Sequence, residues 1–142
     1  MSKENIMEQV RKFIRTYPPL SNDKINVDFL PAEARSYAVE SIPTKEVVRY
    51  YLDGSSVRQF EFVLSSREFY GEKIRQQLDN LGFYEDFSRW LTAQTMARNL
   101  PNLGEGKKAM IMEATTSGYA FAVDENKARY QIQCRLEYFQ SK

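Results

Sequence analysis

The sequence ARYQIQCRLEYF, residues Ala128 to Phe139, alternates between apolar and polar side chains over its whole length. Its apolar positions are Ala128, Tyr130, Ile132, Cys134, Leu136 and Tyr138. A period of two residues is typical of a β-strand with one face in a core and the other in water. At about 3.3 Å per residue, this strand reaches roughly 40 Å. We therefore expect it to run through the middle of an antiparallel sheet, with neighbours along its length.

Two shorter segments precede this strand and alternate in the same way. Lys108 to Thr116 predicts one strand, and Tyr119 to Val123 predicts the next after a turn at Ser117 and Gly118. A polar turn from Asp124 to Lys127 then leads into the long strand. The last third of the chain, residues 108–139, is therefore expected to be a three-stranded meander.

A hairpin is predicted further towards the N-terminus. Val47 to Leu52 and Val57 to Leu64 form its two arms, and Asp53 to Ser56 forms the turn, where Asp-Gly favours a positive φ. The first arm is apolar on both faces, so we expect it to be central or covered on both sides. Ile25 to Leu30 and Tyr37 to Ile42 predict two shorter strands, and the prolines around the second suit an edge.

Apolar spacing changes to the helical period in two regions. Lys3 to Thr16 predicts an amphipathic helix that covers one sheet face and ends before Pro18 and Pro19. A second helical block, beginning at Glu68 or Gly71 and ending near Leu100, predicts two helices, or one helix kinked at Gly82.

Strands and helices thus follow each other in blocks, which is typical of the α+β class. We expect a mostly antiparallel sheet with an N-terminal helix and a central helical block packed on it. The 142 residues fit a single domain. Its predicted parts are an N-terminal helix in 1–20, strands and a hairpin in 25–64, helices in 68–100 and the meander in 108–139.

Composition excludes several chemistries. The chain has no histidine, so it lacks Ser-His-Asp and Cys-His catalysis and histidine-ligated zinc. Its single cysteine cannot form an internal disulfide. A net charge of +1 argues against a strongly basic nucleic-acid binder. The sequence holds no apolar run of membrane-spanning length and starts without a signal peptide, so we expect no membrane partner and a cytoplasmic site of synthesis.

Candidate sites in the sequence favour structural interpretations. Cys134 lies on the apolar face of the long strand and is expected in the core. The segment from Asn102 to Lys107 contains two glycines, but its context does not match that of a phosphate-binding loop, so a contact loop is the better interpretation. Glu113 is a candidate for an ion pair. Basic residues on predicted neighbouring elements could form a modest positive face: Lys107, Lys108, Lys127, Arg129 and Arg135.

The chain has more aromatic residues than a small core needs. It contains nine tyrosines and nine phenylalanines, and six of these aromatic residues cannot all be buried in one monomer: Tyr50, Tyr51, Phe69, Tyr70, Tyr84 and Phe139. Surplus aromatic side chains are common on protein–protein surfaces. The residues therefore indicate assembly, without naming a partner.

Three segments resemble one family, the small minor capsid or tail-terminator (tail-completion) proteins of siphophages and prophages of Gram-positive bacteria. They are SREFYGEKIRQQLDNLGFYEDFSRWL (Ser66 to Leu91), LPNLGEGK (Leu100 to Lys107) and ATTSGYAFAVDENKARYQIQCRLEY (Ala114 to Tyr138). Together they span about half of the chain. The first 45 residues match in outline only.

The resemblance implies a structural protein of virion assembly, with no catalytic residue, cofactor or metal. Such proteins form a ring, commonly a hexamer, which caps the tail tube, joins the head–tail connector and lets DNA pass without sequence recognition. The implied location is the tail or neck of the virion, after assembly in the cytoplasm of the bacterial host. The implied partners are further copies of the chain, the major tail tube protein and the connector protein.

Candidate contact residues follow from the ring that the resemblance implies. Its subunits would meet through two different patches. We assign Phe69 and Tyr84 to the subunit interface. Asp53, Gly54, Gly104 and Lys107 are assigned to contacts with the tube or connector, and Arg129 and Arg135 to the channel.

Two alternatives stay open at this point. One is another head–tail joining or head-completion adaptor, which would bind the portal side. The other is a small ligand-binding or enzymatic α+β domain, which would need a deep pocket with converging polar groups.

Overall fold

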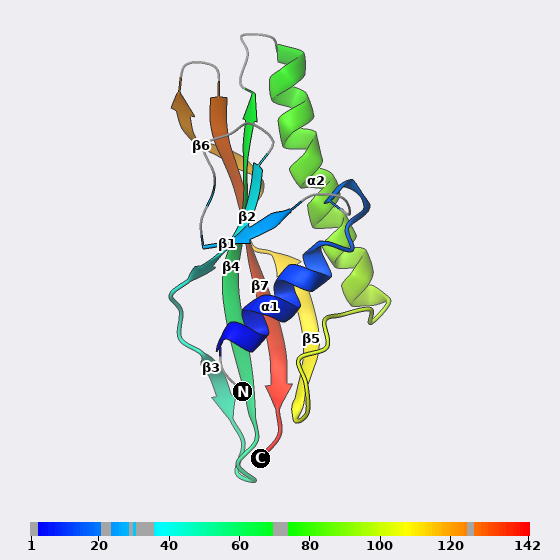
Figure 1. Ribbon diagram of the computed structural model, residues 1–142. Coiled ribbons are helices and arrows are strands. Elements are labelled where there is room, and N and C mark those ends of the chain that lie inside the picture. The colour runs from blue at the N-terminus through cyan, green and yellow to red at the C-terminus, as the bar shows by residue number, and fades with distance from the viewer. Residues whose placement is uncertain (1–2, 21–23, 29, 31–35, 70–73, 125–126) are drawn as a thin grey trace.

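The computed structural model describes residues 3–20, 24–28, 30, 36–69, 74–124 and 127–142. In this part of the chain, seven strands form one mixed sheet, and the helices pack on one of its faces (Figure 1). The strands are β1 (Ile25–Val27), β2 (Ser36–Ile42), β3 (Val47–Tyr50), β4 (Ser56–Phe69), β5 (Lys107–Ala114), β6 (Tyr119–Asp124) and β7 (Lys127–Gln140). The helices are α1 (Lys3–Ile14) and α2 (Ile74–Met96), and a short 3-10 turn, η1 (Pro18–Leu20), follows α1.

Two long strands, β4 and β7, form the centre of the sheet. Each has 14 residues, and they pair antiparallel from Ser56 with Gln140 to Phe69 with Lys127. The prediction of a long central strand with neighbours along its length is therefore confirmed. The apolar side chains of this predicted strand, β7, all lie in the core, as the alternation indicated.

Shorter strands flank this central pair, two on each side. On one side, β2 pairs with residues 61–67 of β4 and β3 with residues 56–58. On the other side, β5 pairs with residues 134–140 of β7 and β6 with residues 127–131. The predicted meander is therefore wrong in its pairing, because β5 and β6 each pair with β7, one after the other along its edge. The parallel pairing of β1 with β2 makes the sheet mixed, and places β2 inside the sheet rather than at the expected edge.

The predicted fold class is also wrong. We expected an α+β fold with a mostly antiparallel sheet and a central helical block; the structure is mostly β, a seven-stranded mixed sheet with only two α-helices in the described residues. The pairing of β4 with β7 explains the difference, because it keeps the chain extended through Glu68, where the helical block was expected to start. The other expected start, Gly71, lies outside the described residues.

Helix α2 continues through Gly82 without the predicted break. Gly54, Gly104 and Gly106 adopt a positive φ, whereas Gly82 is not among the glycines that do. A glycine inside a helix weakens it relative to alanine but does not end it when the backbone keeps helical angles. Of the two predicted arrangements, two helices or one helix with a kink at Gly82, the structure thus has the single helix.

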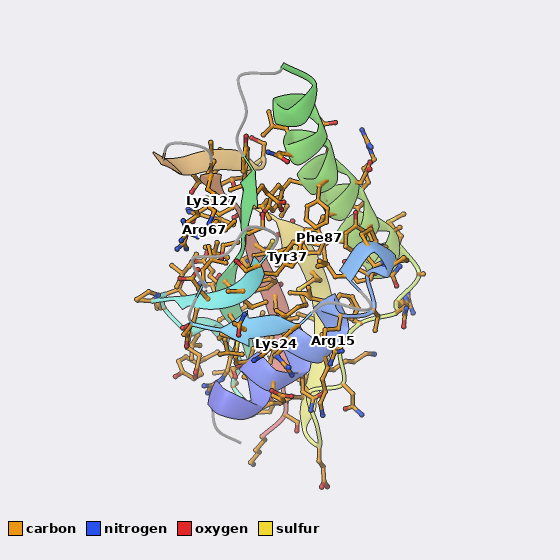
Figure 2. The ribbon with its side chains drawn as sticks, turned by 45° about the horizontal axis from the view of Figure 1, so that its top comes forward. Arg15, Lys24, Tyr37, Arg67, Phe87 and Lys127 are labelled. Atoms are coloured by element: carbon orange, nitrogen blue, oxygen red, sulfur yellow. The ribbon has the colours of Figure 1, made fainter. Side chains whose placement is uncertain are left out.

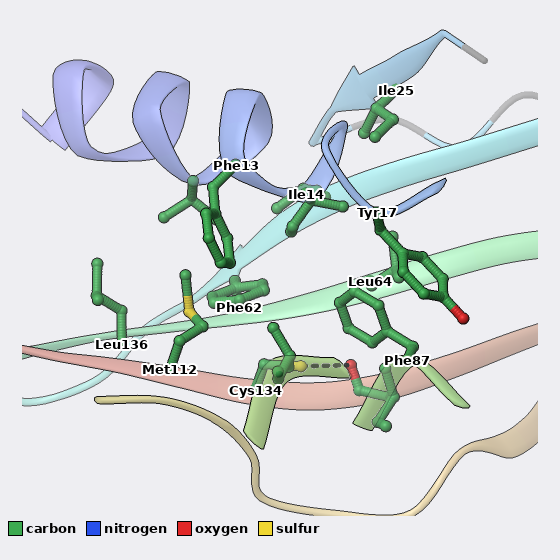
Figure 3. Close-up of a cluster of buried hydrophobic side chains, with 14 of the residues drawn as sticks. Phe13, Ile14, Tyr17, Ile25, Phe62, Leu64, Phe87, Met112, Cys134 and Leu136 are labelled. Carbon is green, nitrogen blue, oxygen red and sulfur yellow. Dashed lines mark hydrogen bonds between the residues drawn. The ribbon is translucent and has the colours of Figure 1, made fainter. Parts of the chain in front are cut away.

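The core lies between the two helices and one face of β4 and β7 (Figure 3). It is built from Phe62 and Leu64 of β4, Ile132, Cys134 and Leu136 of β7, Val10 and Ile14 of α1, and Phe87 and Leu91 of α2. Tyr17 joins the helices, since its ring centroid lies 5.3 Å from that of Phe87 and 5.1 Å from that of Trp90. The expected core position of Cys134 is confirmed, and burial raises the pKa of its thiol.

Helix α2 also protects one edge of the sheet. The hydroxyl of Thr95 donates to the carbonyl of Met112 at 2.8 Å and accepts from its N–H at 3.1 Å. These backbone groups belong to β5, at the outer side of the sheet. At Met112, both backbone groups are therefore occupied and cannot pair with a further strand.

Candidate interaction surface at the hairpin end

The turn between β3 and β4 is held by a compact set of hydrogen bonds. Tyr51 donates its N–H to the carbonyl of Ser55 at 2.9 Å, and Gly54 donates to the carbonyl of Tyr51 at 3.1 Å. The carboxylate of Asp53 accepts from the hydroxyl of Ser55 at 2.6 Å and from its N–H at 2.9 Å. These bonds, the hydroxyl first, lower the pKa of Asp53. Gly54 has a φ of 94°, which favours glycine there.

This well-ordered turn carries exposed apolar side chains. Leu52 is fully exposed, Tyr50 is 70% exposed, and Val48 and Tyr51 are also exposed. The first arm of the hairpin is thus neither central nor covered, which corrects the prediction. Single exposed apolar residues are ordinary, but four within five positions on a protruding hairpin form a patch that calls for an explanation.

Two other segments lie beside the turn. The loop before β5 is closed by Lys107, whose N–H donates to the carbonyl of Gly104 at 3.3 Å. Ser141 donates its N–H to the carbonyl of Gly106 at 2.8 Å. The side chain of Lys142 lies so close to Gly54 that an added Cβ would come within 3.4 Å of it. We call this region the hairpin end: residues 48–55, 104–107 and 139–142, at the bottom of Figure 1.

Four of the residues predicted as partner contacts meet at the hairpin end. Asp53 and Gly54 come from the turn, and Gly104 and Lys107 come from the loop before β5, with the last residues of the chain between them. Exposed charges here are basic at Arg49 and Lys142, and acidic at Asp53 and Glu105. The fold therefore gathers into one surface two loops that are about fifty positions apart in sequence.

The two residues predicted for the subunit interface do not join this surface. Tyr84 is fully buried: its hydroxyl bonds to the hydroxyl of Ser66 and donates to the carbonyl of Tyr130 at 3.1 Å. Burial raises the pKa of Tyr84 well above its ordinary value. Its side chain is therefore not available to a partner. Phe69 ends β4 and pairs with Lys127 through the backbone, and its side chain lies outside the described part.

The predicted channel residues lie on the sheet face opposite the helices. Arg129 forms an ion pair with Glu40, and Arg135 forms ion pairs with Glu113 at 2.8 Å and Glu137 at 2.9 Å. The hydrogen bond to Glu113 raises the pKa of Arg135. Figure 2 shows two more cations of this face, Arg67 and Lys127, on the far side of the sheet from Phe87 and α2. Because carboxylates pair with both arginines, the structure does not support a strongly positive channel wall formed by them.

A small cleft lies at the base of the hairpin, between the end of β2 and the start of β3. Its volume is about 140 Å³, and the side chains of Ile6, Phe60 and Tyr138 line its apolar part. Ser41, Thr44 and Glu46 are among its polar lining residues. Glu46 also forms an ion pair with Arg58 of β4.

The surplus of aromatic residues in the sequence predicted part of this surface. Tyr50 and Tyr51 belong to the six aromatic residues that were not all expected to be buried, and both are exposed, whereas Tyr84 of the same set is buried. Val48 and Leu52 were missed, because an apolar arm was interpreted as a buried strand. The sequence feature that indicates their exposure is the run VVRYYL, which is apolar on both faces yet ends directly at a turn. A strand of four residues at the edge of the sheet has little to cover it there.

Comparison of the chain with models of protein families and with curated proteins finds no match. Among the described residues, neither helix is both long enough and apolar enough to cross a membrane.

Proposed function

We propose that this protein is a structural subunit of phage morphogenesis, a tail terminator that assembles as a ring on the end of the tail tube. The ring caps the tube, joins it to the head–tail connector, and leaves an opening for DNA. The protein carries out no reaction in this role. The resemblance described above motivates the proposal, and the hairpin end supports it.

The observation that carries the proposal is the exposed apolar patch on the hairpin. In the single chain, the side chains of Leu52 and Tyr50 are exposed to solvent. They lie at a turn that the hydrogen bonds between Asp53 and Ser55 hold in shape. A preformed apolar patch loses little conformational entropy when it is covered. It lies at the end of the two longest strands, where it is accessible to another subunit. These properties favour a protein that works by assembly.

The test begins with the mass of the purified protein. We expect light scattering to find a species near six times 16.6 kDa, and negative stain to show rings, either alone or after addition of the tail tube protein. A Leu52→Asp variant should lose this assembly, because a carboxylate cannot be buried without a partner. Met96→Asp is the matched control, since Met96 is 81% exposed but lies on α2.

Three outcomes would count against the proposal. The first is a monomer that neither forms rings nor binds tail tubes at any concentration. The second is specific binding to the portal-side connector without binding to tubes, which would identify a head-completion adaptor instead. The third is equal loss of assembly in Leu52→Asp and Met96→Asp, which would show that the hairpin end has no specific role in assembly.

A further inference from the structure

We propose that the outer surface at the end of α1 contacts the phosphate backbone of double-stranded DNA. The cations of this surface are Lys12 and Arg15 at the end of α1, and Lys24 just before β1. We call these three residues the α1 cations. The inference deepens the proposed function and rests on it for one point, that DNA passes this protein. It assigns the DNA contact to residues other than the predicted channel arginines, which are paired with carboxylates.

The α1 cations are exposed and have no carboxylate partner. In the part of the chain that the structure describes, none of the three forms an ion pair. One carboxylate lies a helical turn before Lys12, that of Glu8, and it bonds to Arg11 at 3.2 Å. The open sheet face differs, because Arg135 there is held by Glu113 and Glu137. A phosphate can therefore meet the α1 cations without first breaking an ion pair.

The fold brings the α1 cations to one place. The Nε of Arg11 donates to the carbonyl of Ile25 at 2.8 Å, which holds Lys24 beside the helix. Arg15 follows Arg11 by one turn, since its N–H donates to the carbonyl of Arg11 at 3.1 Å. Lys12 precedes Arg15 by three residues, a spacing that makes two side chains neighbours on a helix surface. Figure 2 shows Arg15 and Lys24 next to each other.

A groove beside Lys12 adds neutral hydrogen-bonding groups. It has a volume of about 280 Å³ and lies between α1 and the connection from α2 to β5. Its lining residues are Gln9, Lys12, Phe13, Thr16, Asn99, Leu100, Pro101 and Asn102, and none of these is acidic. The side-chain oxygen of Asn102 accepts from the N–H of Gly104 at 3.0 Å, which orients its amide and leaves the amide nitrogen as a donor.

The chemistry of this surface fits a nucleic-acid backbone better than a protein or a lipid bilayer. The described part of α1 and the groove carry no exposed large apolar side chain. Protein interfaces use aromatic or aliphatic anchors, and bilayer surfaces take up apolar side chains. Contacts to DNA phosphates come instead from Lys and Arg, together with Thr, Asn and Gln. These are the residue types found here.

Three cations predict binding that is weak and sensitive to salt. Three neutralised phosphates give a slope of about −2.7 in a plot of log affinity against log salt concentration. Such contacts carry no sequence information and let a protein slide along DNA. In a ring, every copy presents the same cations to one duplex. The surface is therefore suited to guide DNA through an opening without holding it.

Fluorescence anisotropy with a short labelled duplex of mixed sequence tests the surface. The wild-type protein should bind at low salt, and a fourfold rise in salt should weaken this binding about 40-fold. The triple variant Lys12→Gln, Arg15→Gln and Lys24→Gln should weaken low-salt binding by about tenfold or more, and should remove most of the salt dependence. Lys24→Gln alone lies outside the helix, so α1 stays intact, and it should lower the slope by about one.

The matched control removes three exposed cations from another part of the surface. It carries Lys45→Gln, Arg49→Gln and Lys108→Gln, and it should bind the duplex like the wild type. Both triple variants have the same net charge. Urea midpoints of both variants check that each is folded. Equal weakening in the two triple variants, or no binding of the duplex by the wild type, would overturn the inference.

Further outcomes separate other ligands and the proposed function. Equal binding to phosphatidylserine vesicles, lost in the same triple variant, would assign the surface to lipid headgroups and overturn the inference. Strong competition by inorganic phosphate at constant ionic strength would indicate a site for a single anion and would also overturn it. Rings from a protein that binds no duplex would overturn the inference and leave the terminator proposal standing. Duplex binding by a protein that forms neither rings nor tube complexes would support the surface and contradict the function.

Discussion

Tyr84 shows at the scale of a single residue how polar groups enter this core. Its hydroxyl lies between β4 and β7, where it bonds to Ser66 on one strand and to the carbonyl of Tyr130 on the other. Gly118 makes room for it, since an added Cβ there would lie 2.4 Å from the Cβ of Tyr84. The helix, the central strands and the β5–β6 connection therefore meet at one side chain.

Replacing Tyr84 by Phe should lower the free energy of unfolding by about 1–3 kcal/mol. The variant keeps the ring but leaves the buried hydroxyl of Ser66 and the carbonyl of Tyr130 without this partner. Urea denaturation measures the change. Tyr50→Phe is the control and should stay within about 0.5 kcal/mol, because Tyr50 is exposed. Equal losses in both variants would contradict the role given to the hydroxyl.

Asp53 provides a second test at this scale. Replacing Ser55 by Ala removes the hydroxyl donor and keeps the N–H donor, so the pKa of Asp53 should rise but stay below its ordinary value. The depressed pKa means that the ionised carboxylate stabilises the folded turn above the unfolded pKa, and that this support is lost as pH falls through the folded pKa. Titration of the Asp53 carboxyl by NMR measures both values. An unchanged pKa would exclude the hydroxyl as the main cause.

At the scale of elements, the sequence predicted the strands and helix faces that produce a regular alternation or a helical spacing of apolar residues. The long strand, the hairpin and the apolar face of α1 through Ile6, Val10 and Phe13 are all found. Strand pairing was beyond such patterns, because register depends on partners far away in the chain. The boundary at Glu68 could not be predicted for the same reason. The local spacing there is helical, but pairing with β7 keeps Glu68 in a strand. The two halves of the hairpin end meet for this reason too, through β7, which pairs with both β4 and β5.

Gly82 tests whether α2 is one continuous helix. Gly82→Ala should stabilise the protein by about 0.5–1 kcal/mol, because alanine restricts the unfolded chain and an added Cβ would meet nothing within 4 Å. The urea midpoint should rise. Gly106→Ala is the opposing control: its φ of 79° and the Ser141 hydroxyl 3.1 Å from the added Cβ make alanine unfavourable there. A lower midpoint for Gly82→Ala would indicate a break that the structure lacks.

At the scale of the whole molecule, the sheet separates two different environments. One face is closed by α1 and α2 over an apolar core, and the other holds ion pairs such as Arg129 with Glu40 and Arg135 with Glu113. Neither face offers a large apolar patch comparable to that of the hairpin end among the described residues. Assembly through an end, with the open face left in water, is consistent with this division.

The reactivity of the Cys134 thiol measures how readily the whole domain unfolds. It is buried at the centre of β7, and burial raises the pKa of its thiol, so the native protein should react with thiol reagents only after unfolding. The reaction rate should therefore follow the global stability: slower in Gly82→Ala and faster in Tyr84→Phe. Alkylation followed by mass spectrometry measures it. A fast reaction that is the same in both variants would indicate local opening near β7.

The continuous pairing of β4 with β7 has a mechanical consequence. A force applied to the hairpin along β4 acts parallel to the two strands, so the hydrogen bonds of all 14 residues bear the load together. Strands pulled apart from one end would instead lose their bonds one after another. The hairpin end is therefore attached to the two longest paired strands, and these transmit a pull or a push along β4 into the body of the domain.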